Sequence, residues 1–136
     1  MIARALATLL LLGGPAAADG FASPTGNILC YLEPSAAPAT APVSCLIFEA
    51  TWPMPDADPT CDLDRTRMVT LPRRGPARAE LACHGDVFWP LPLGTLGYGS
   101  EWSVQGIGCS MATDGVRCVN ATGDGFHVRR AALTLR

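Results

Sequence analysis

The clearest chemistry in this sequence belongs to its six cysteines. An even number of cysteines in a short chain predicts a disulfide framework, because a small domain buries too little apolar surface to be very stable alone. A zinc site would instead need closely spaced pairs such as Cys-x-x-Cys, and the sequence contains no such pair. We therefore expect disulfides and no metal.

Turn residues between the last two cysteines indicate one disulfide directly. Thr113-Asp114-Gly115 interrupts the stretch from Cys109 to Cys118. A hairpin with Gly115 at positive φ places Cys109 opposite Cys118, at a Cα separation of about 4.5 to 5.5 Å that a disulfide can span. Spacing alone does not decide the other pairs. The shortest loops pair Cys30 with Cys45 and Cys61 with Cys83, each contributing about 3 kcal/mol.

Two histidines could exchange protons near neutral pH. His84 precedes Gly85 and Asp86, so a hydrolase-like pair of His84 and Asp86 is one hypothesis. We favour the simpler interpretation, in which Asp86 makes a turn and His84 points into water. His127 lies between two apolar neighbours in an expected strand and should face solvent. Because no serine stands in a nucleophile motif and no thiol is spare, we assign no catalytic residue.

Four carboxylates, Asp56, Asp58, Asp62 and Asp64, lie close together in the sequence. They could hold calcium weakly, but their spacing matches no known calcium loop, and we interpret them as solvated acids. The sequon Asn120-Ala-Thr122 is expected to carry no glycan, because the tripeptide is common by chance. We predict no cofactor.

An aromatic group offers the best binding hypothesis. Trp89, Tyr98 and Trp102 lie among prolines and glycines, and such amphipathic side chains are enriched where proteins meet partners. The competing interpretation, which we favour, is a core cluster that closes one end of the fold. The candidate ligand-binding residues are these three aromatics together with His84 and Asp86.

Residues 1–18 have the layout of a secretory signal peptide: a charged start at Arg4, an apolar run, a Gly-Gly-Pro break and three alanines. Cleavage is expected after Ala18, which leaves residues 19–136 as one domain. The apolar run, Ala5–Leu12, is much shorter than the roughly 20 residues that cross a bilayer. No cysteine stands at the cleavage point for lipid attachment, and we expect no membrane insertion of the mature protein.

Composition narrows the class of partner and of fold. The formal net charge is −2, and the basic residues are all scattered arginines apart from Arg73-Arg74 and Arg129-Arg130. Without a basic stripe, nucleic acid is an unexpected partner. The 14 glycines and 12 prolines disfavour long helices.

Short apolar runs separated by turn residues predict an all-β fold, a small antiparallel sandwich or barrel stapled by three disulfides. Prolines at positions 53, 55 and 59 exclude a regular strand between the second and third runs. The expected strands are 28–32, 43–48, 68–71, 77–83, 87–89, 102–105, 107–111, 116–119 and 126–135.

Several motifs resemble those of a known group of proteins. They are Phe21-x-Ser-Pro-x-Gly-Asn-Ile-x-Cys30, Val43-x-Cys45, Trp52-Pro53, Cys61, Cys83-x-Gly-Asp86, Leu96-x-Tyr-Gly99, Gly115-Val-x-Cys-x-Asn120 and Thr122-Gly-x-Gly-Phe126. In these motifs the chain resembles a family of small secreted bacterial proteins with no assigned function. Asp124 departs from the pattern, which has a histidine between the two glycines. The resemblance implies turn formers and disulfides, and it implies no activity.

These features together predict a noncatalytic periplasmic or secreted module that binds another envelope component, a protein or a glycan. A small hydrolase-like enzyme that uses His84 and Asp86 is the second hypothesis. A purely structural envelope protein is the third.

Overall fold

The computed structural model describes residues 19–34, 37, 39–54, 59–86 and 93–136 as two antiparallel sheets of five strands each. The predicted signal peptide, residues 1–18, lies outside the described residues. The first sheet contains β1 (Gly20–Ala22), β2 (Ile28–Leu32), β3 (Val43–Ile47), β4 (Asp64–Leu71) and β5 (Arg78–His84). The second contains β6 (Glu101–Val104), β7 (Ile107–Ala112), β8 (Gly115–Val119), β9 (Gly125–Arg129) and β10 (Ala132–Leu135). The all-β prediction is confirmed.

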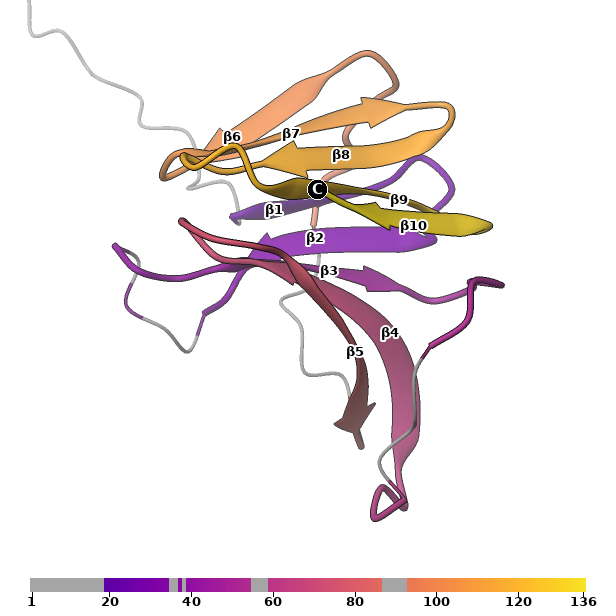
Figure 1. The fold of residues 1–136 in the computed structure, drawn as a ribbon. Helices are drawn as coiled ribbons and strands as arrows, with labels where there is room; N and C mark the ends of the chain where they lie inside the picture. The colour runs from indigo at the N-terminus through magenta and orange to yellow at the C-terminus, as the bar shows by residue number, and fades with distance from the viewer. Residues whose placement is uncertain (1–18, 35–36, 38, 55–58, 87–92) are drawn as a thin grey trace, which may run out of the picture.

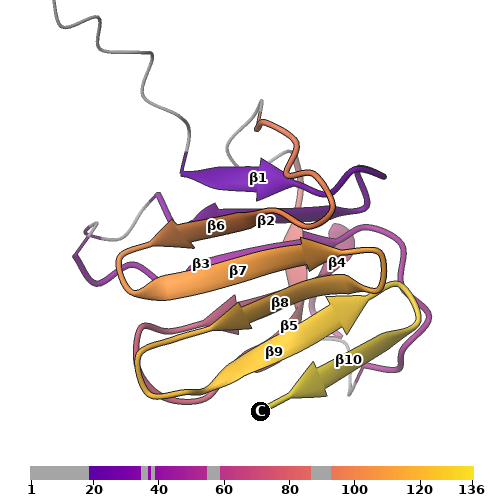
Figure 2. The same cartoon turned by 90° about the horizontal axis from the view of Figure 1, so that it is seen from above.

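Each sheet is a meander whose strands are neighbours in both sequence and space. The two sheets stack face to face as a sandwich (Figures 1 and 2). Within each sheet, every strand therefore pairs with the strand that follows it along the chain, and the longest connection, residues 48–63, joins β3 to β4. No helix able to cross a bilayer occurs among the described residues.

The core fills the space between the sheets because apolar side chains alternate along the strands. In β7 the residues Ile107, Cys109 and Met111 are buried and their neighbours are only half-buried. Phe126 and Val128 contribute in the same way from β9. This alternation leaves the opposite face of the second sheet open to solvent.

The three disulfides join the expected pairs, Cys30 with Cys45, Cys61 with Cys83 and Cys109 with Cys118. Two of them link directly opposed residues, between β2 and β3 and between β7 and β8, with Cα separations of 4.0 and 4.1 Å. Both lie between the second and third strands of their own sheets. The two halves of the chain therefore share a strand arrangement and a buried cross-strand disulfide.

The β7–β8 hairpin has the register that the sequence predicted. Met111 is opposite Val116, and Gly115 has a φ of 115°. A Cβ at this position would lie 2.1 Å from the carbonyl oxygen of Val128, so both conformation and space require glycine there.

Two strand predictions differ from the structure. The run expected as one strand over 126–135 is a hairpin, with β9 and β10 joined through Arg130 and Ala131. β1 was not expected, and it is held on both sides: it pairs with β2, and Ala22 also bonds to Gly94 and Leu96 through its backbone. The expected strand at 87–89 lies outside the described residues.

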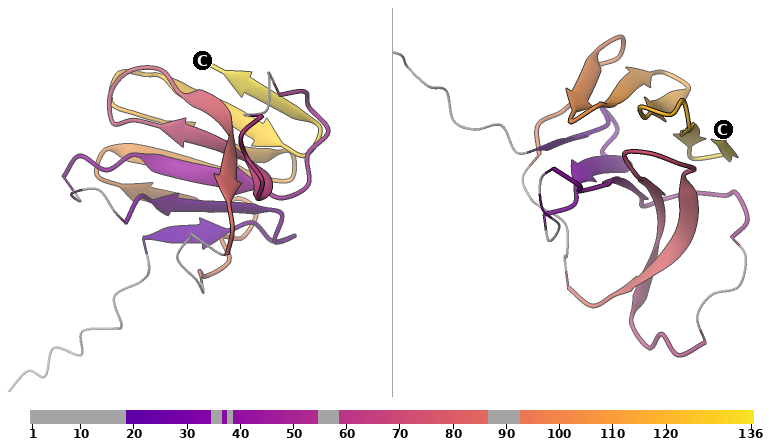
Figure 3. Two further views of the ribbon diagram at one scale, coloured as in Figure 1. Left: turned by 90° about the horizontal axis from the view of Figure 1, so that it is seen from below. Right: turned by 60° about the vertical axis from the view of Figure 1, so that its left-hand side comes forward.

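The β4–β5 hairpin curves away from the sandwich (Figure 3). In β4 the three residues at the Leu71 end are buried, whereas Asp64 and Arg65 at the other end are exposed. Polar residues therefore occupy both faces of β4 where the second sheet no longer covers it, and the strand begins earlier than the apolar run indicated. At this end the Cys61–Cys83 disulfide joins β5 to the segment that precedes β4.

A second apolar cluster covers the outer face of the first sheet, where Leu29, Tyr31 and Leu46 are buried. The Tyr31 hydroxyl has no hydrogen-bond partner among the described residues. Burial, and secondly the charge of Glu33, raise the pKa of this phenol above its ordinary value.

We expect Tyr31→Phe to raise the free energy of unfolding by about 1 kcal/mol at neutral pH, because it keeps the ring and removes a buried hydroxyl without a partner. The raised pKa also means that the contribution of Tyr31 to wild-type stability is constant below about pH 10, the unfolded value, and falls as the pH rises above it. Tyr31→Phe should lose less stability in that range. Urea denaturation at pH 7 and pH 11 checks both results, and a less stable variant at pH 7 would contradict them.

Candidate binding site

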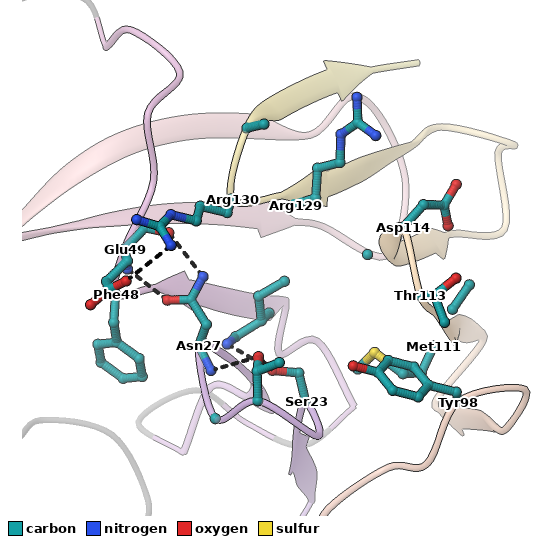
Figure 4. A pocket seen from close by; sticks show the side chains of 16 residues that line it. Ser23, Asn27, Phe48, Glu49, Tyr98, Met111, Thr113, Asp114, Arg129 and Arg130 are labelled. Carbon is teal, nitrogen blue, oxygen red and sulfur yellow. Dashed lines mark hydrogen bonds and ion pairs between the residues drawn. The ribbon is translucent and has the colours of Figure 1, made fainter.

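A cavity of about 830 Å3 opens at one end of the sandwich. Its wall is assembled from five separate segments: the β1–β2 turn, the chain after β3, the loop before β6, the β7–β8 hairpin and the β9–β10 turn (Figure 4). The volume lies in the range of sites that bind drug-sized ligands. No single stretch of sequence contains the site.

Aromatic side chains stand at the rim of this cavity. Phe48 and Tyr98 are 42% and 51% exposed, and they are the only aromatic residues among the exposed large apolar side chains of the described segments. Both line the cavity, above the buried Ile28 and Met111. Tyr98 lies beside Met111 with its hydroxyl directed toward the β1–β2 turn, and Phe48 lies at the far rim below Glu49 (Figure 4). The cavity thus has apolar surface at both ends.

Hydrogen bonds from neighbouring loops fix the wall. The Asn27 side chain donates to the carbonyl oxygen of Glu49 at 2.8 Å and accepts from its N–H at 2.7 Å. Because the amide copies the pairing of a β-strand, it ties the β1–β2 turn to the chain after β3. The segments on this side of the cavity therefore cannot move independently.

The β9–β10 turn is held in the same way. The buried Trp52 indole donates to the carbonyl oxygen of Arg129 at 3.1 Å, and the Thr51 N–H donates to that of Arg130 at 2.8 Å. Arg67 lies over the Trp52 ring, 5.2 Å from its centroid, in a cation–π contact. Two consecutive arginines are thus anchored through their backbone while their side chains stay at the surface.

Charges around the cavity are paired except at one arginine. Arg130 contacts Glu49 at 3.6 Å, and Asp114 contacts Arg117 at 2.8 Å. Arg129 has no ion-pair partner within the described segments. An unneutralised guanidinium therefore stands at the rim, although the chain as a whole carries a net charge of −2.

Asp114 also links the cavity to the outer face of the second sheet. The hydrogen bond from Arg117 holds the pKa of Asp114 below its ordinary value. The resulting stabilisation is present above about pH 4, the unfolded value, and is lost as the pH falls through the lowered value.

His127 Nε2 lies 2.8 Å from the carbonyl oxygen of Asp114 and 3.9 Å from its carboxylate. His127 faces away from the core as expected, but it is half-buried rather than free in solvent.

The aromatic residues proposed from sequence do not form one cluster. Tyr98 lines the cavity. Trp102 instead packs edge-on against Phe21 at 5.3 Å, next to the core. Trp89 lies outside the described residues. Phe48, which sequence reasoning did not select, lies at the opposite rim from Tyr98.

His84 and Asp86 lie elsewhere, at the end of the β4–β5 hairpin. His84 Nε2 is 2.7 Å from the Thr66 hydroxyl, and Asp86 is exposed in the bend that follows β5. A hydroxyl beside an imidazole is one part of a nucleophilic site. However, neither His84 nor Asp86 lines the end cavity. The hydrolase hypothesis stays a prediction, with Thr66 as the hydroxyl that sequence reasoning missed.

Of the four clustered acids, Asp62 and Asp64 are exposed, and Asp56 and Asp58 lie outside the described residues. Within the described ranges, no three histidine, cysteine or acidic side chains are grouped closely enough to hold a metal ion.

A side chain in the sequon serves the fold. Asn120 is 6% exposed, and its amide nitrogen donates to the carbonyl oxygens of Pro72 at 2.9 Å and Gly75 at 2.8 Å. Its amide oxygen accepts from the N–H groups of Thr122 and Asp124. Asn120 therefore joins the β4–β5 turn of one sheet to the β8–β9 turn of the other. Both hydrogens of the nitrogen that would carry an N-linked glycan are used in the folded protein.

Comparisons with protein-family models, with curated proteins and with solved structures found no match to this chain. The resemblance to secreted bacterial proteins stays a prediction, and function rests on the geometry of the site.

Proposed function

We propose that this chain is a noncatalytic binding module that receives another envelope component, a protein or a glycan, in the cavity at the end of its sandwich. The observation that carries the proposal is the pair of exposed aromatic side chains, Phe48 and Tyr98, at opposite rims of one cavity. Exposed aromatics cost solubility and are enriched at binding surfaces. A purely structural protein has no need of them there.

The hydrogen bonds to Asn27, Arg129 and Arg130 support the same proposal. A wall that is already fixed loses little conformational entropy when a ligand binds, so more of the contact energy appears as affinity. Binding sites built on rigid elements also hold their geometry more accurately than free loops. The wall of the end cavity is fixed in this way by hydrogen bonds, although turns form most of it.

The proposed setting is the periplasm or the extracellular space of a bacterium, reached after removal of the predicted leader 1–18. The three disulfides support an oxidising compartment. The choice between periplasm and secretion rests on the leader and on the family resemblance, both of which are sequence predictions.

The experiment compares two truncations of exposed apolar residues. Tyr98→Ala removes a cavity residue, and Leu63→Ala removes a side chain that is 58% exposed outside the cavity. The disulfide-bonded protein is passed over immobilised bacterial envelope material, separated into protein and glycan fractions. We expect wild type and Leu63→Ala to be retained by one fraction and Tyr98→Ala to be retained at least about tenfold less, since an aromatic side chain that anchors a ligand contributes about 2 kcal/mol or more.

Both variants should unfold within about 0.5 kcal/mol of wild type, because each alters the surface. Equal retention of Tyr98→Ala would show that the cavity is not the binding surface. No retention of wild type by either fraction would contradict a binding function.

A further inference from the structure

We infer that the ligand of the end cavity is an acidic oligosaccharide, whose carboxylate is bound by Arg129 and whose sugar rings pack on Tyr98 and Phe48. The inference rests on the proposed binding function and adds the chemical class of the ligand. Three features support it: no edge strand lines the cavity, an arginine without an ion-pair partner stands at its rim, and its apolar surface is aromatic at both ends.

The cavity offers no strand edge to a peptide. The edge strands of the two sheets are β1, β5, β6 and β10. None of the residues that line the cavity belongs to these four strands; they lie in turns or in the interior strands β2, β7, β8 and β9. An extended peptide binds to a sheet chiefly by adding a strand through main-chain hydrogen bonds at an edge. That mode is closed here, which favours a ligand recognised by side chains.

The positive charge of Arg129 at the rim favours a ligand that carries an anionic group. Arg130 and Asp114 are each paired at the surface, with Glu49 and Arg117 respectively, whereas Arg129 has no acidic partner within the described ranges. Its backbone carbonyl accepts a hydrogen bond from the Trp52 indole, so the point on the chain from which the Arg129 side chain extends is fixed. A planar guanidinium binds a carboxylate through two parallel hydrogen bonds. Arg129 is therefore the residue we assign to the acid group of the ligand.

The aromatic side chains at the two rims favour a ligand whose rings have an apolar face, as sugar rings do. The face of an aromatic ring carries partial negative charge, and the C–H groups on one side of a pyranose carry partial positive charge, so the two surfaces attract. Tyr98 and Phe48 stand at opposite rims (Figure 4), so a ligand that touches both must extend over more than one sugar unit. The buried Ile28 and Met111 give the floor between them an apolar surface.

The test uses trigalacturonic acid and its fully methyl-esterified form, which share the same rings and differ in charge. Calorimetric titration of the disulfide-bonded protein should give at least about tenfold weaker binding for the ester, because hydrogen bonds to charged groups are stronger than neutral ones. Arg129→Gln should weaken binding of the acid by a similar factor and leave the ester unchanged. The matched control is Arg136→Gln, an exposed arginine outside the cavity, which should behave as wild type. Tyr98→Ala should weaken both ligands.

Equal affinity for acid and ester, or equal effects of Arg129→Gln and Arg136→Gln, would overturn carboxylate recognition. Binding of neither saccharide would overturn the inference as well. In that case, Tyr98-dependent retention on envelope material would show that the proposed binding function still stands with another ligand class. Loss of that retention too would mean that both are wrong.

Discussion

Complete reduction of the three disulfides is expected to unfold this protein at room temperature. Their loops span 15, 22 and 9 residues of sequence separation, and loops of this size contribute about 3 kcal/mol each in the chain-entropy model. The combined loss is comparable with the whole stability of a typical small domain, about 5 to 15 kcal/mol. Circular dichroism and urea denaturation, with and without reductant, measure the effect.

The disulfides should not open together. Cys83 is exposed, whereas Cys30 and Cys45 are fully buried and Cys109 and Cys118 nearly so. Mild reductant should therefore open Cys61–Cys83 first, with the sandwich still folded, since thiol attack requires access to a sulfur. Alkylation followed by peptide mass spectrometry identifies the order. The matched control is the Cys61→Ala, Cys83→Ala double variant, which should keep the sandwich. An unchanged urea midpoint after full reduction would contradict the prediction, as would six alkyl tags without reductant.

Asn120→Asp is expected to lower the free energy of unfolding by about 3 kcal/mol. The substitution keeps the oxygen that Thr122 and Asp124 bond to, but it replaces the nitrogen that donates to Pro72 and Gly75. Two carbonyl oxygens at a part-buried junction lose a donor that is itself buried, and each such loss costs about 1 to 3 kcal/mol. Denaturation by urea at pH 7 measures the change.

Asn27→Asp provides a matched control for this prediction. Asn27 also donates to a backbone carbonyl and accepts from a backbone N–H, but its bonds to Glu49 are exposed to water. Its loss should cost about 1 kcal/mol or less, because water replaces the missing donor. Equal effects of the two substitutions would mean that burial of the sheet-to-sheet junction does not set the cost.

Local patterning was sufficient to predict most of the fold. Ile28–Leu32 and Val116–Val119 stand out as strands because turn residues bound them on both sides, and Gly115 fixed the register that brings Cys109 to Cys118. The β9–β10 hairpin was missed because its turn, at Arg130 and Ala131, contains none of the residues that mark turns. β1 was missed because the loop that supports it comes from Gly94 to Leu96, far along the chain.

The site was harder to predict for the same reason. Nearness in sequence suggested Tyr98 and Trp102 as partners, yet Trp102 faces the core because residues alternate along β6. The cavity residues Asn27, Phe48 and Arg129 come together through packing of the two sheets, which no local pattern reports. Asn120 was noticed only as a sequon, because its real partners lie in a turn about 45 residues earlier.

The six cysteines pair first with second, third with fourth and fifth with sixth along the chain, and the two sheets are built from separate, uninterrupted halves of the sequence. As the chain emerges, every disulfide can thus close as soon as its second cysteine appears, without waiting for later residues. An oxidase that joins thiols in order of appearance would produce the native pattern directly. With this pairing, the disulfides can form in order from the N-terminus to the C-terminus, and none of them has to be broken and formed again.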